Sequence, residues 1–140
     1  MKKSSCPPPI DIKAWKKQIE KVPFIHLLGM KLISFDEHGL VMEMKIVPKM
    51  INYLGVIHGG TLTSMIDTAV YFAIRPLIPK ERELTTTEMK TNFFRAVAKG
   101  TLTARARVLH LGKRTAVGEA EIFDGQERLV AKGTVGHLIT

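Results

Sequence analysis

One stretch of helical periodicity interrupts a chain that otherwise alternates in the manner of β-strands. Between Gly59 and Leu77 the apolar residues recur at intervals of three and four and form one stripe: Leu62, Met65, Ile66, Ala69, Val70, Ala73 and Leu77. This period predicts a single long amphipathic helix, which Pro76 and Pro79 close. Such a helix must bury its stripe against another layer, and the segments available to it read mainly as strands.

Six segments show the alternation that is typical of strands, at residues 30–35, 40–47, 84–96, 101–110, 114–123 and 128–137. We expect the last four to form an antiparallel meander, because Asp124-Gly125 is a strong hairpin signal. A short helix is predicted over residues 11–22, with Asp11 as its cap and Pro23 as its stop. Together these elements predict an α+β fold, a curved sheet wrapped around one central helix.

Length and composition predict one domain. The 140 residues suffice for a single core, and we assign residues 11–140 to it and residues 1–10 to a flexible tail. Cys6, the one cysteine, excludes an internal disulfide and supports no metal site. No apolar run approaches the ~20 residues of a membrane span, and the two lysines of the tail precede no apolar run of a secretory signal. We therefore expect a cytoplasmic protein that does not enter membranes.

The net charge of +8 favours an anionic partner or substrate. A nucleic-acid-binding module typically clusters its basic residues and interleaves aromatic ones. Here the charge is spread along the chain, and only 6% of the residues are aromatic. We therefore expect a phosphate-bearing small molecule and no nucleic acid, and a steep salt dependence of DNA or RNA affinity would contradict this.

The start of the long helix carries the candidate site. His58, Gly59 and Gly60 follow a short loop, and Asp67 comes seven residues beyond Gly60. Glycines at a helix start leave N–H groups unshielded, and a helix N-terminus favours developing negative charge. A carboxylate within reach of a carbonyl held there would make a hydrolytic or proton-transfer site. On local sequence alone, a glycine cap followed by a solvated Asp accounts for the same residues.

Helix geometry separates the two halves of this candidate site. Gly59 and Asp67 are eight residues apart, which places them about 12 Å from each other along the helix axis. A hydrolytic site needs its electrophile and its base within about 3–4 Å of a shared water. If both residues serve one reaction, they must come from two chains whose helices pack antiparallel, as in a two-fold dimer. The hydrolytic hypothesis therefore also predicts a dimer with two equivalent sites.

The segment from Asn52 to Gly60 resembles the signature of hotdog-fold acyl-CoA thioesterases. Its pattern is Asn-x-x-Gly-x-x-His-Gly-Gly, with Asp67 nine residues beyond His58. The resemblance is closest to the phenylacetate-pathway branch, which includes the small mammalian acyl-CoA thioesterases; related branches carry Glu at the position of Asp67. The expected element order agrees over residues 24–138, and Phe93-Phe94 and residues 129–134 are further matches.

The resemblance implies a role for each matching residue. The Gly59 N–H would polarise the thioester carbonyl and stabilise the oxyanion. Asp67 of the partner chain would act as general base or as nucleophile. Asn52 and His58 would order the loop and help to position the thioester or the water. The family places a small hydroxyl residue near Thr86 to assist the water; Thr85, Thr86 and Thr87 are consecutive, and we assign the role to Thr86.

Further residues are assigned to substrate binding: Gly60, Ser64, Arg95, Lys113 and Arg114. The three basic residues sit at or before predicted turns and are the best candidates for contacting the CoA phosphates, although a solvated turn is the commoner role for any single one of them. Glu88 reads as part of a polar strand face. The histidines apart from His58, at positions 26, 38, 110 and 137, lack metal-ligand spacing and are assigned structural roles.

We therefore predict hydrolysis of acyl-CoA by a homodimer, assembled further into a homotetramer, with no metal or redox cofactor and with CoA present only as part of the substrate. Two alternatives on the same fold stay open. One is an acyl-ACP thioesterase or a dehydratase, although no His and acid pair arranged as in dehydratases is found. The other is an acyl-CoA-binding sensor, which would have no need of the Asp67 carboxylate. The acyl group itself is left open among long, medium and aromatic chains.

Overall fold

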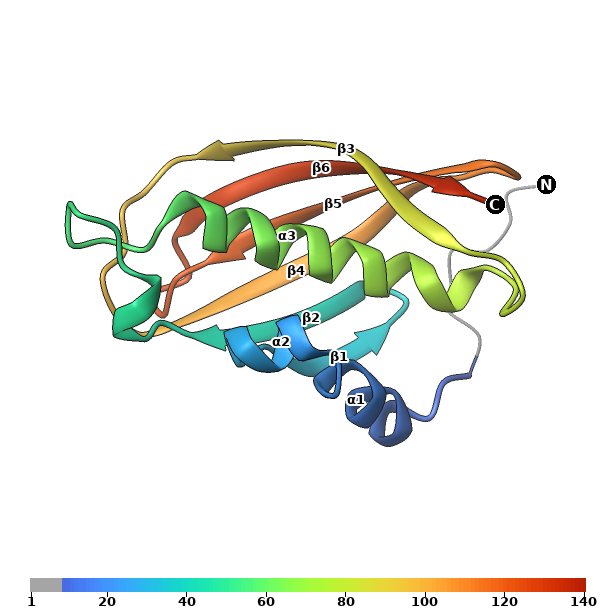
Figure 1. Cartoon of the computed structure of the whole chain (residues 1–140), viewed down its shortest axis with the longest axis horizontal. Helices are drawn as coiled ribbons and strands as arrows, with labels where there is room; N and C mark the ends of the chain where they lie inside the picture. Colours follow the sequence, from blue (N-terminus) through green and yellow to red (C-terminus); the bar gives the residue numbers. More distant parts are fainter. Residues whose placement is uncertain (1–8) are drawn as a thin grey trace.

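The computed structural model describes residues 9–140; Cys6 and the rest of the predicted tail up to residue 8 lie outside the described residues. The order of elements is α1 (Ile12–Glu20), α2 (Pro23–Leu28), β1 (Lys31–Asp36), β2 (Gly39–Lys45), α3 (Gly59–Ile74), β3 (Leu84–Phe93), β4 (Thr101–Leu111), β5 (Thr115–Phe123) and β6 (Leu129–Ile139). Two short 3-10 helices are η1 (Pro48–Met50) and η2 (Arg75–Leu77). The strands form one antiparallel sheet that curves around α3 (Figure 1), which confirms the predicted α+β architecture.

The strand order is β1-β2-β4-β5-β6-β3, so the predicted four-strand meander is wrong for β3. The meander holds for β4, β5 and β6, but β3 pairs with β6. The reason is that β2 already occupies one side of β4, with Leu40 opposite Ala106, while β5 occupies the other. β3 therefore takes the free side of β6 and becomes an edge strand of the sheet (Figure 1). Alternation along a strand specifies its faces but not its neighbours.

Small residues on the inner face of the sheet let α3 approach closely. This face carries Ala104, Ala106, Gly118, Ala120, Ala131 and Gly133, all of which are buried. A Cβ added to Gly118 would lie 2.6 Å from a methyl of Val70, and one added to Gly133 would lie 3.0 Å from a methyl of Ile66. The larger side chains of α3 thus fill the space between the helix and the sheet. The predicted stripe from Leu62 to Ala73 is buried. Leu77 is half-buried, beyond the last α-helical residue.

The N-terminal helical segment differs from the prediction in one respect. Asp11 caps α1, and its side chain accepts a hydrogen bond from the Ala14 N–H at 3.1 Å, as expected. Pro23, however, is also the first residue of a second helix, α2, which the sequence analysis missed. Proline suits the first helical position because its missing N–H would have no intrahelical acceptor there. The turn brings Val22 and Phe24 beside α3.

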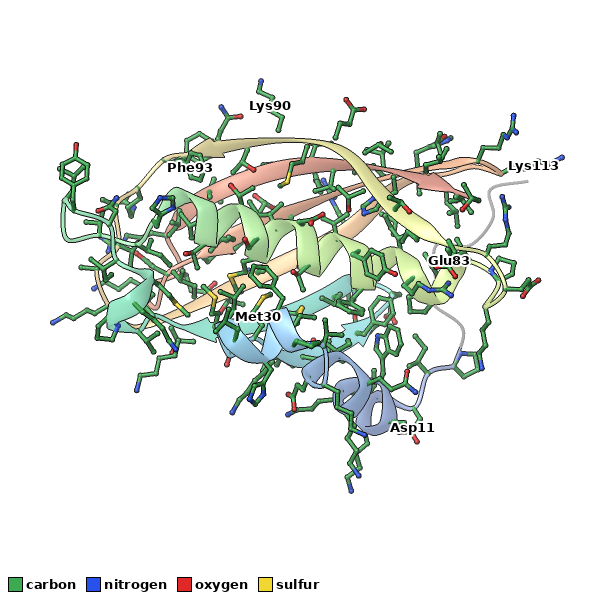
Figure 2. The ribbon with its side chains drawn as sticks, viewed as in Figure 1. Asp11, Met30, Glu83, Lys90, Phe93 and Lys113 are labelled. Atoms are coloured by element: carbon green, nitrogen blue, oxygen red, sulfur yellow. The ribbon has the colours of Figure 1, made fainter. Side chains whose placement is uncertain are left out.

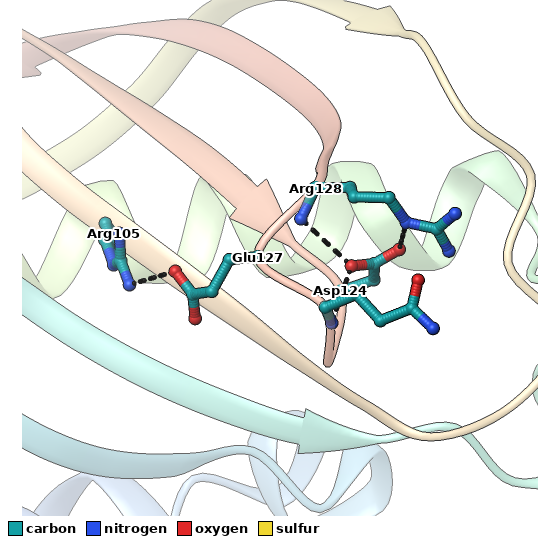
Figure 3. A network of polar contacts seen from close by, with 5 residues as sticks. Arg105, Asp124, Glu127 and Arg128 are labelled. Atoms are coloured by element: carbon teal, nitrogen blue, oxygen red, sulfur yellow. Dashed lines mark hydrogen bonds and ion pairs between the residues drawn. The ribbon is translucent and has the colours of Figure 1, made fainter.

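The β5–β6 hairpin contains the predicted Asp-Gly turn (Figure 3). Asp124 is buried and accepts hydrogen bonds from the N–H groups of Gln126 and Arg128, and its other oxygen accepts one from the Arg128 side chain at 2.8 Å. Burial alone would raise the pKa of Asp124, but these hydrogen bonds and the Arg128 charge outweigh it and hold the pKa below its usual value. The hairpin is thereby tied to an ionised carboxylate.

Two general features bear on function. Among residues 9–140, no helix is long and apolar enough to cross a membrane. Over the same residues, no group of three or more His, Cys, Asp or Glu side chains is placed to hold a metal ion.

Candidate active site

The N-terminus of α3 presents an unused backbone donor. His58 is the N-cap, and its Nδ1 accepts a hydrogen bond from the Gly60 N–H at 2.8 Å, so the proton of the neutral ring lies on Nε2. A Cβ at Gly60 would come within 2.9 Å of that nitrogen, which explains the second glycine. The Gly59 N–H donates to no acceptor among residues 9–140. This group, at the positive end of a 16-residue helix, can polarise a carbonyl oxygen.

Asn52 holds the loop that leads into α3. Its side-chain oxygen accepts hydrogen bonds from the N–H groups of Leu54 and Val56, at 2.9 and 3.3 Å. Its backbone closes the same loop, because the Asn52 N–H donates to the Val56 carbonyl and the Asn52 carbonyl accepts from the Gly55 N–H. Gly55 has a φ of +83°, which glycine adopts without strain. The signature residues before His58 therefore form one self-bonded loop.

A groove of about 360 Å³ opens beside Gly59. It is lined by residues of the loop, of α3 and of the segment that ends β3: Val56, Ile57, Gly59, Leu62, Phe93, Phe94, Arg95 and Ala96. The ring of Phe93 lies where a Cβ at Gly59 would come within 3.3 Å of it, so a side chain at this position would crowd the groove. Arg95 is the basic side chain of this groove, and it is exposed.

Asp67 lies further along α3, half-buried, and meets β3. The Thr86 hydroxyl donates a hydrogen bond to Asp67 Oδ1 at 2.9 Å. The neighbouring Thr85 and Thr87 are exposed, and the Thr87 hydroxyl instead donates to the Gly136 carbonyl. Of the three consecutive threonines, Thr86 is thus the one whose hydroxyl contacts the carboxylate.

A second groove, of about 300 Å³, opens beside Asp67. Its lining comes from α3 and from the α2 region: Val22, Phe24, Ile25, Asp67, Thr68, Tyr71 and Phe72. Apart from Asp67, Thr68 and the Tyr71 hydroxyl, these side chains are apolar. The groove shares no lining residue with the one beside Gly59. Within one chain, the backbone donor and the carboxylate therefore belong to two separate grooves, in agreement with the helix geometry.

The remaining predicted residues are dispersed. The Ser64 hydroxyl donates to the Gly60 carbonyl one turn earlier, at 2.8 Å, and so bonds within its own helix. Lys113 and Arg114 lie at the β4–β5 hairpin, where the Lys113 carbonyl accepts from Arg82, a residue that follows the C-terminal end of α3. Lys113 is at the far end of the molecule from Phe93, which lines the Gly59 groove (Figure 2). Arg95 alone among the predicted basic residues lies beside Gly59 in the same chain.

The structure places one further residue near Asp67, a histidine to which the sequence alone assigned a structural role. His137 on β6 is 2% exposed and pairs across the sheet with Thr86. Its ring centroid lies 6.2 Å from that of Tyr71, which is one helical turn beyond Asp67. Strand alternation could have predicted its burial, because residues 133, 135 and 137 fall on the same face of the strand and Gly133 and Val135 are buried.

The thioesterase superfamily matches this chain over residues 54–131. The acyl-coenzyme A thioesterase PaaI of Escherichia coli is 35% identical over 124 residues, which cover 85% of this chain and 86% of that protein. The 1,4-dihydroxy-2-naphthoyl-CoA hydrolase of Listeria monocytogenes is 25% identical over 103 residues, covering 74% of this chain and 84% of the hydrolase.

Solved structures agree with this result. The E. coli PaaI structure superposes with a TM-score of 0.80 at 32% identity, over 91% of this chain and 94% of that one. A thioesterase from Haemophilus influenzae superposes with a TM-score of 0.88 over 96% and 94%, and at 19% identity it shows a common fold. The chain therefore belongs to the thioesterase superfamily and has its hotdog fold.

Proposed function

We propose that the protein hydrolyses acyl-CoA thioesters to the free acid and CoA, at two equivalent sites that are each shared between two protomers. The observation that carries the proposal is the separation of the two half-sites. The free Gly59 N–H and the Asp67 carboxylate line different grooves of one chain, about 12 Å apart along the helix axis. A second chain that runs antiparallel brings the Gly59 groove of one protomer to the Asp67 groove of its partner.

The edge of the sheet supports such a dimer. β3 is a ten-residue edge strand without proline, and its outer side has no strand partner among residues 9–140. An open edge of this length is a template for pairing with another strand. Two copies of β3 that pair antiparallel about a two-fold axis extend the sheet and place their α3 helices antiparallel.

Exposed apolar side chains border both grooves. Phe93 and Phe94 at the Gly59 groove are 52% and 59% exposed, and Phe24 at the Asp67 groove is 51% exposed. Aromatic surface of this extent is costly to leave in water and typically marks a binding surface. The proposed dimer covers part of it and leaves the remainder as the wall of an acyl pocket. A tetramer formed from two such dimers is part of the proposal.

The chemistry follows from the two half-sites. The thioester carbonyl oxygen accepts a hydrogen bond from the Gly59 N–H, where the positive end of the α3 dipole stabilises the oxyanion. The partner's Asp67 takes a proton from water as the water oxygen bonds to the carbonyl carbon. The tetrahedral intermediate then expels the CoA thiolate, and the proton on Asp67 passes to the sulfur. In the variant mechanism the Asp67 carboxylate attacks the carbonyl carbon and expels the CoA thiolate, and water then hydrolyses the mixed anhydride to the free acid and the Asp67 carboxylate.

Roles for the other predicted residues follow from their places. Asn52 and His58 hold the loop and the helix start that present the Gly59 N–H. Thr86 orients the Asp67 carboxylate. Arg95 is the basic side chain that lines the Gly59 groove and is a candidate for a CoA phosphate. Lys113 and Arg114 serve the CoA phosphates only where a partner chain brings their hairpin to the site.

The experiment that tests the proposal is a panel of acyl-CoA thioesters of aromatic, medium and long chains, assayed with the wild type and with Asp67→Asn and Asp67→Ala. We expect turnover by the wild type and a loss of about 10²- to 10⁴-fold in kcat in both variants. Retained turnover in both would refute the role of Asp67. An acyl-ACP substrate in the same panel tests the carrier, and tight binding of acyl-CoA without turnover would indicate a sensor instead.

A further inference from the structure

A buried imidazole without a hydrogen-bond partner lies behind Asp67. The side chain of His137 is 2% exposed, and neither Nδ1 nor Nε2 has a hydrogen-bond partner among residues 9–140. A buried polar group that bonds to nothing costs about 1–3 kcal/mol of folding free energy, and more than nine in ten such groups in folded proteins are satisfied. A histidine at this position therefore calls for an explanation that an apolar residue would not need.

The position of His137 points to Asp67. Its Cα pairs with that of Thr86 on β3, and the Thr86 hydroxyl holds Asp67 Oδ1 at 2.9 Å. Its ring lies against Tyr71, which is on the same face of α3 as Asp67 because the two are four residues apart. Thr86 on β3 thus contacts Asp67 directly, and His137 on β6 lies beside Thr86, close enough for the Asp67 charge to act on its ring. Asp67 Oδ2 accepts no hydrogen bond among the described residues.

The charges around the ring are few. From α3, the titratable groups Asp67 and Tyr71 face His137. From the sheet, the cross-strand partners are Thr86 on β3 and Ala116 on β5, neither of which titrates. Glu88 lies where a Cβ on Gly136 would point. Gly136 and His137 are neighbours on a strand and face opposite sides of the sheet, so Glu88 does not face the ring. Burial lowers the pKa of His137 below its usual value, and the charge of Asp67 offsets this in part. The ring is therefore neutral at pH 7.

We infer that His137 is a positioning residue for the proposed thioesterase reaction: when the dimer assembles, its neutral ring turns to donate an N–H to Asp67 Oδ2, a bond that the single chain does not make, and with Thr86 on Oδ1 it orients the carboxylate toward the water. The inference rests on the proposed function of Asp67. Protonation of the ring at low pH replaces this uncharged hydrogen-bond donor by a cation beside the base. A cation stabilises the carboxylate and weakens it as a proton acceptor, so kcat falls on the acid side as His137 becomes charged.

The test compares His137→Leu with His137→Gln, because glutamine keeps an uncharged N–H donor and leucine has none. His110→Leu, an exposed histidine on β4, is the matched control. We expect His137→Leu to lower kcat about tenfold to a hundredfold with KM changed less than about threefold. We expect His137→Gln to recover most of kcat at pH 7 and to move the acid limb of the kcat profile to lower pH.

A second measurement does not depend on turnover. The imidazole resonances of the full-length protein are titrated by NMR, and the His137 signal is assigned by its loss in His137→Gln. We expect Asp67→Asn to lower the titration midpoint of His137, because the neighbouring negative charge is gone, and to leave that of His110 unchanged.

The two measurements separate the possible failures. An inactive wild type on every thioester, together with a shifted midpoint, would refute the proposed function and show that the His137 ring senses the Asp67 charge. Full kcat in His137→Leu with an unmoved acid limb would overturn the inference and leave the proposed function intact. An unchanged midpoint in Asp67→Asn would also overturn it, because the ring would then not sense the carboxylate.

Discussion

The Thr86 hydroxyl donates a hydrogen bond to Asp67 Oδ1 across 2.9 Å and so joins the edge strand β3 to the middle of α3. The contact fixes one oxygen of the carboxylate and leaves the other, Oδ2, available to a proton donor. It also places the carboxylate at the side of α3 nearest to the open edge of the sheet. In the proposed dimer this is the side on which the partner chain arrives.

Removal of the Thr86 hydroxyl is predicted to impair turnover. We expect Thr86→Ala to lower kcat about tenfold to a hundredfold, because hydrogen bonds to charged groups are worth about 1.5–3 kcal/mol. Thr86→Ser keeps the hydroxyl and is expected to stay within about threefold of the wild type. Thr85→Ala is the control, since Thr85 is exposed. Equal kcat in Thr86→Ala and Thr85→Ala would show that the contact has no role in catalysis.

The Gly59 N–H can be removed by a proline. Gly59 is the first residue of α3, and His58 before it is extended, with φ −66° and ψ 134°, so proline fits the backbone there. We expect Gly59→Pro to lower kcat about 10²- to 10³-fold through loss of the oxyanion donor. Gly59→Ala keeps the N–H and adds only a Cβ against the Phe93 ring. If the alanine variant loses as much activity as the proline variant, crowding of the groove is responsible.

The close packing of α3 on the sheet predicts a stability defect at Gly118. A Cβ there would lie 2.6 Å from a methyl of Val70 and 3.0 Å from the Arg107 carbonyl oxygen. Valine is stiff in a helix, so the clash is not relieved by a rotamer change. We expect Gly118→Ala to lower the free energy of unfolding by about 1–3 kcal/mol in urea titrations. Gly125→Ala is the control, because no atom lies within 4 Å of its added Cβ; an equal effect there would refute the packing argument.

Acid is predicted to destabilise the fold in two stages. His137 has a lowered pKa in the folded protein, so the unfolded chain takes up its proton first and stability falls below about pH 6.5. For Glu119, burial raises the pKa, but the charges and hydrogen bonds of Arg107 and Lys132 lower it below its usual value. The pKa of Asp124 is lowered as well. Their contributions are present above the unfolded carboxyl pKa of about 4 and are lost as the pH falls through the folded values.

Thermal unfolding from pH 3 to 8 measures both stages. Asp124→Asn is expected to have a lower Tm than the wild type at neutral pH and a smaller fall in Tm below about pH 4. Glu37→Gln, in the exposed β1–β2 turn, is the control. A fall below pH 4 that is identical in Asp124→Asn and the wild type would exclude Asp124 as a source.

Much of the fold could be predicted from periodicity. The stripe on α3, the alternating strand at residues 40–47 and the hairpin at Asp124 are local patterns, and the structure has them as expected. The place of β3 could not be predicted, because its partner β6 lies about 40 residues further along and alternation does not name a partner. The helix at Pro23 was missed because proline stops one helix and starts another equally well.

The candidate site, too, could be predicted from the sequence only in part. The motif from Asn52 to Gly60 is contiguous, so its residues could be named from the sequence. The contact between Asp67 and Thr86, and the neighbour His137, depend on the pairing of β3 with β6 and on the packing of α3. Lys113 and Arg114 were grouped with Arg95 because all three are basic residues near turns, yet the fold places their hairpin at the opposite end of α3. Charge at a turn carries no information on which end of the molecule the turn occupies.

The shared site is tested most directly by mixing two inactive chains. Gly59→Pro and Asp67→Asn are co-expressed with different affinity tags, and the mixed dimer is purified through both. In that dimer one site carries both defects, while the other combines Gly59 of one chain with Asp67 of its partner. We predict about half of the wild-type kcat per dimer, since one of the two equivalent sites is intact. A mixed dimer no more active than its two parents would show that each site lies within a single chain and would contradict the account.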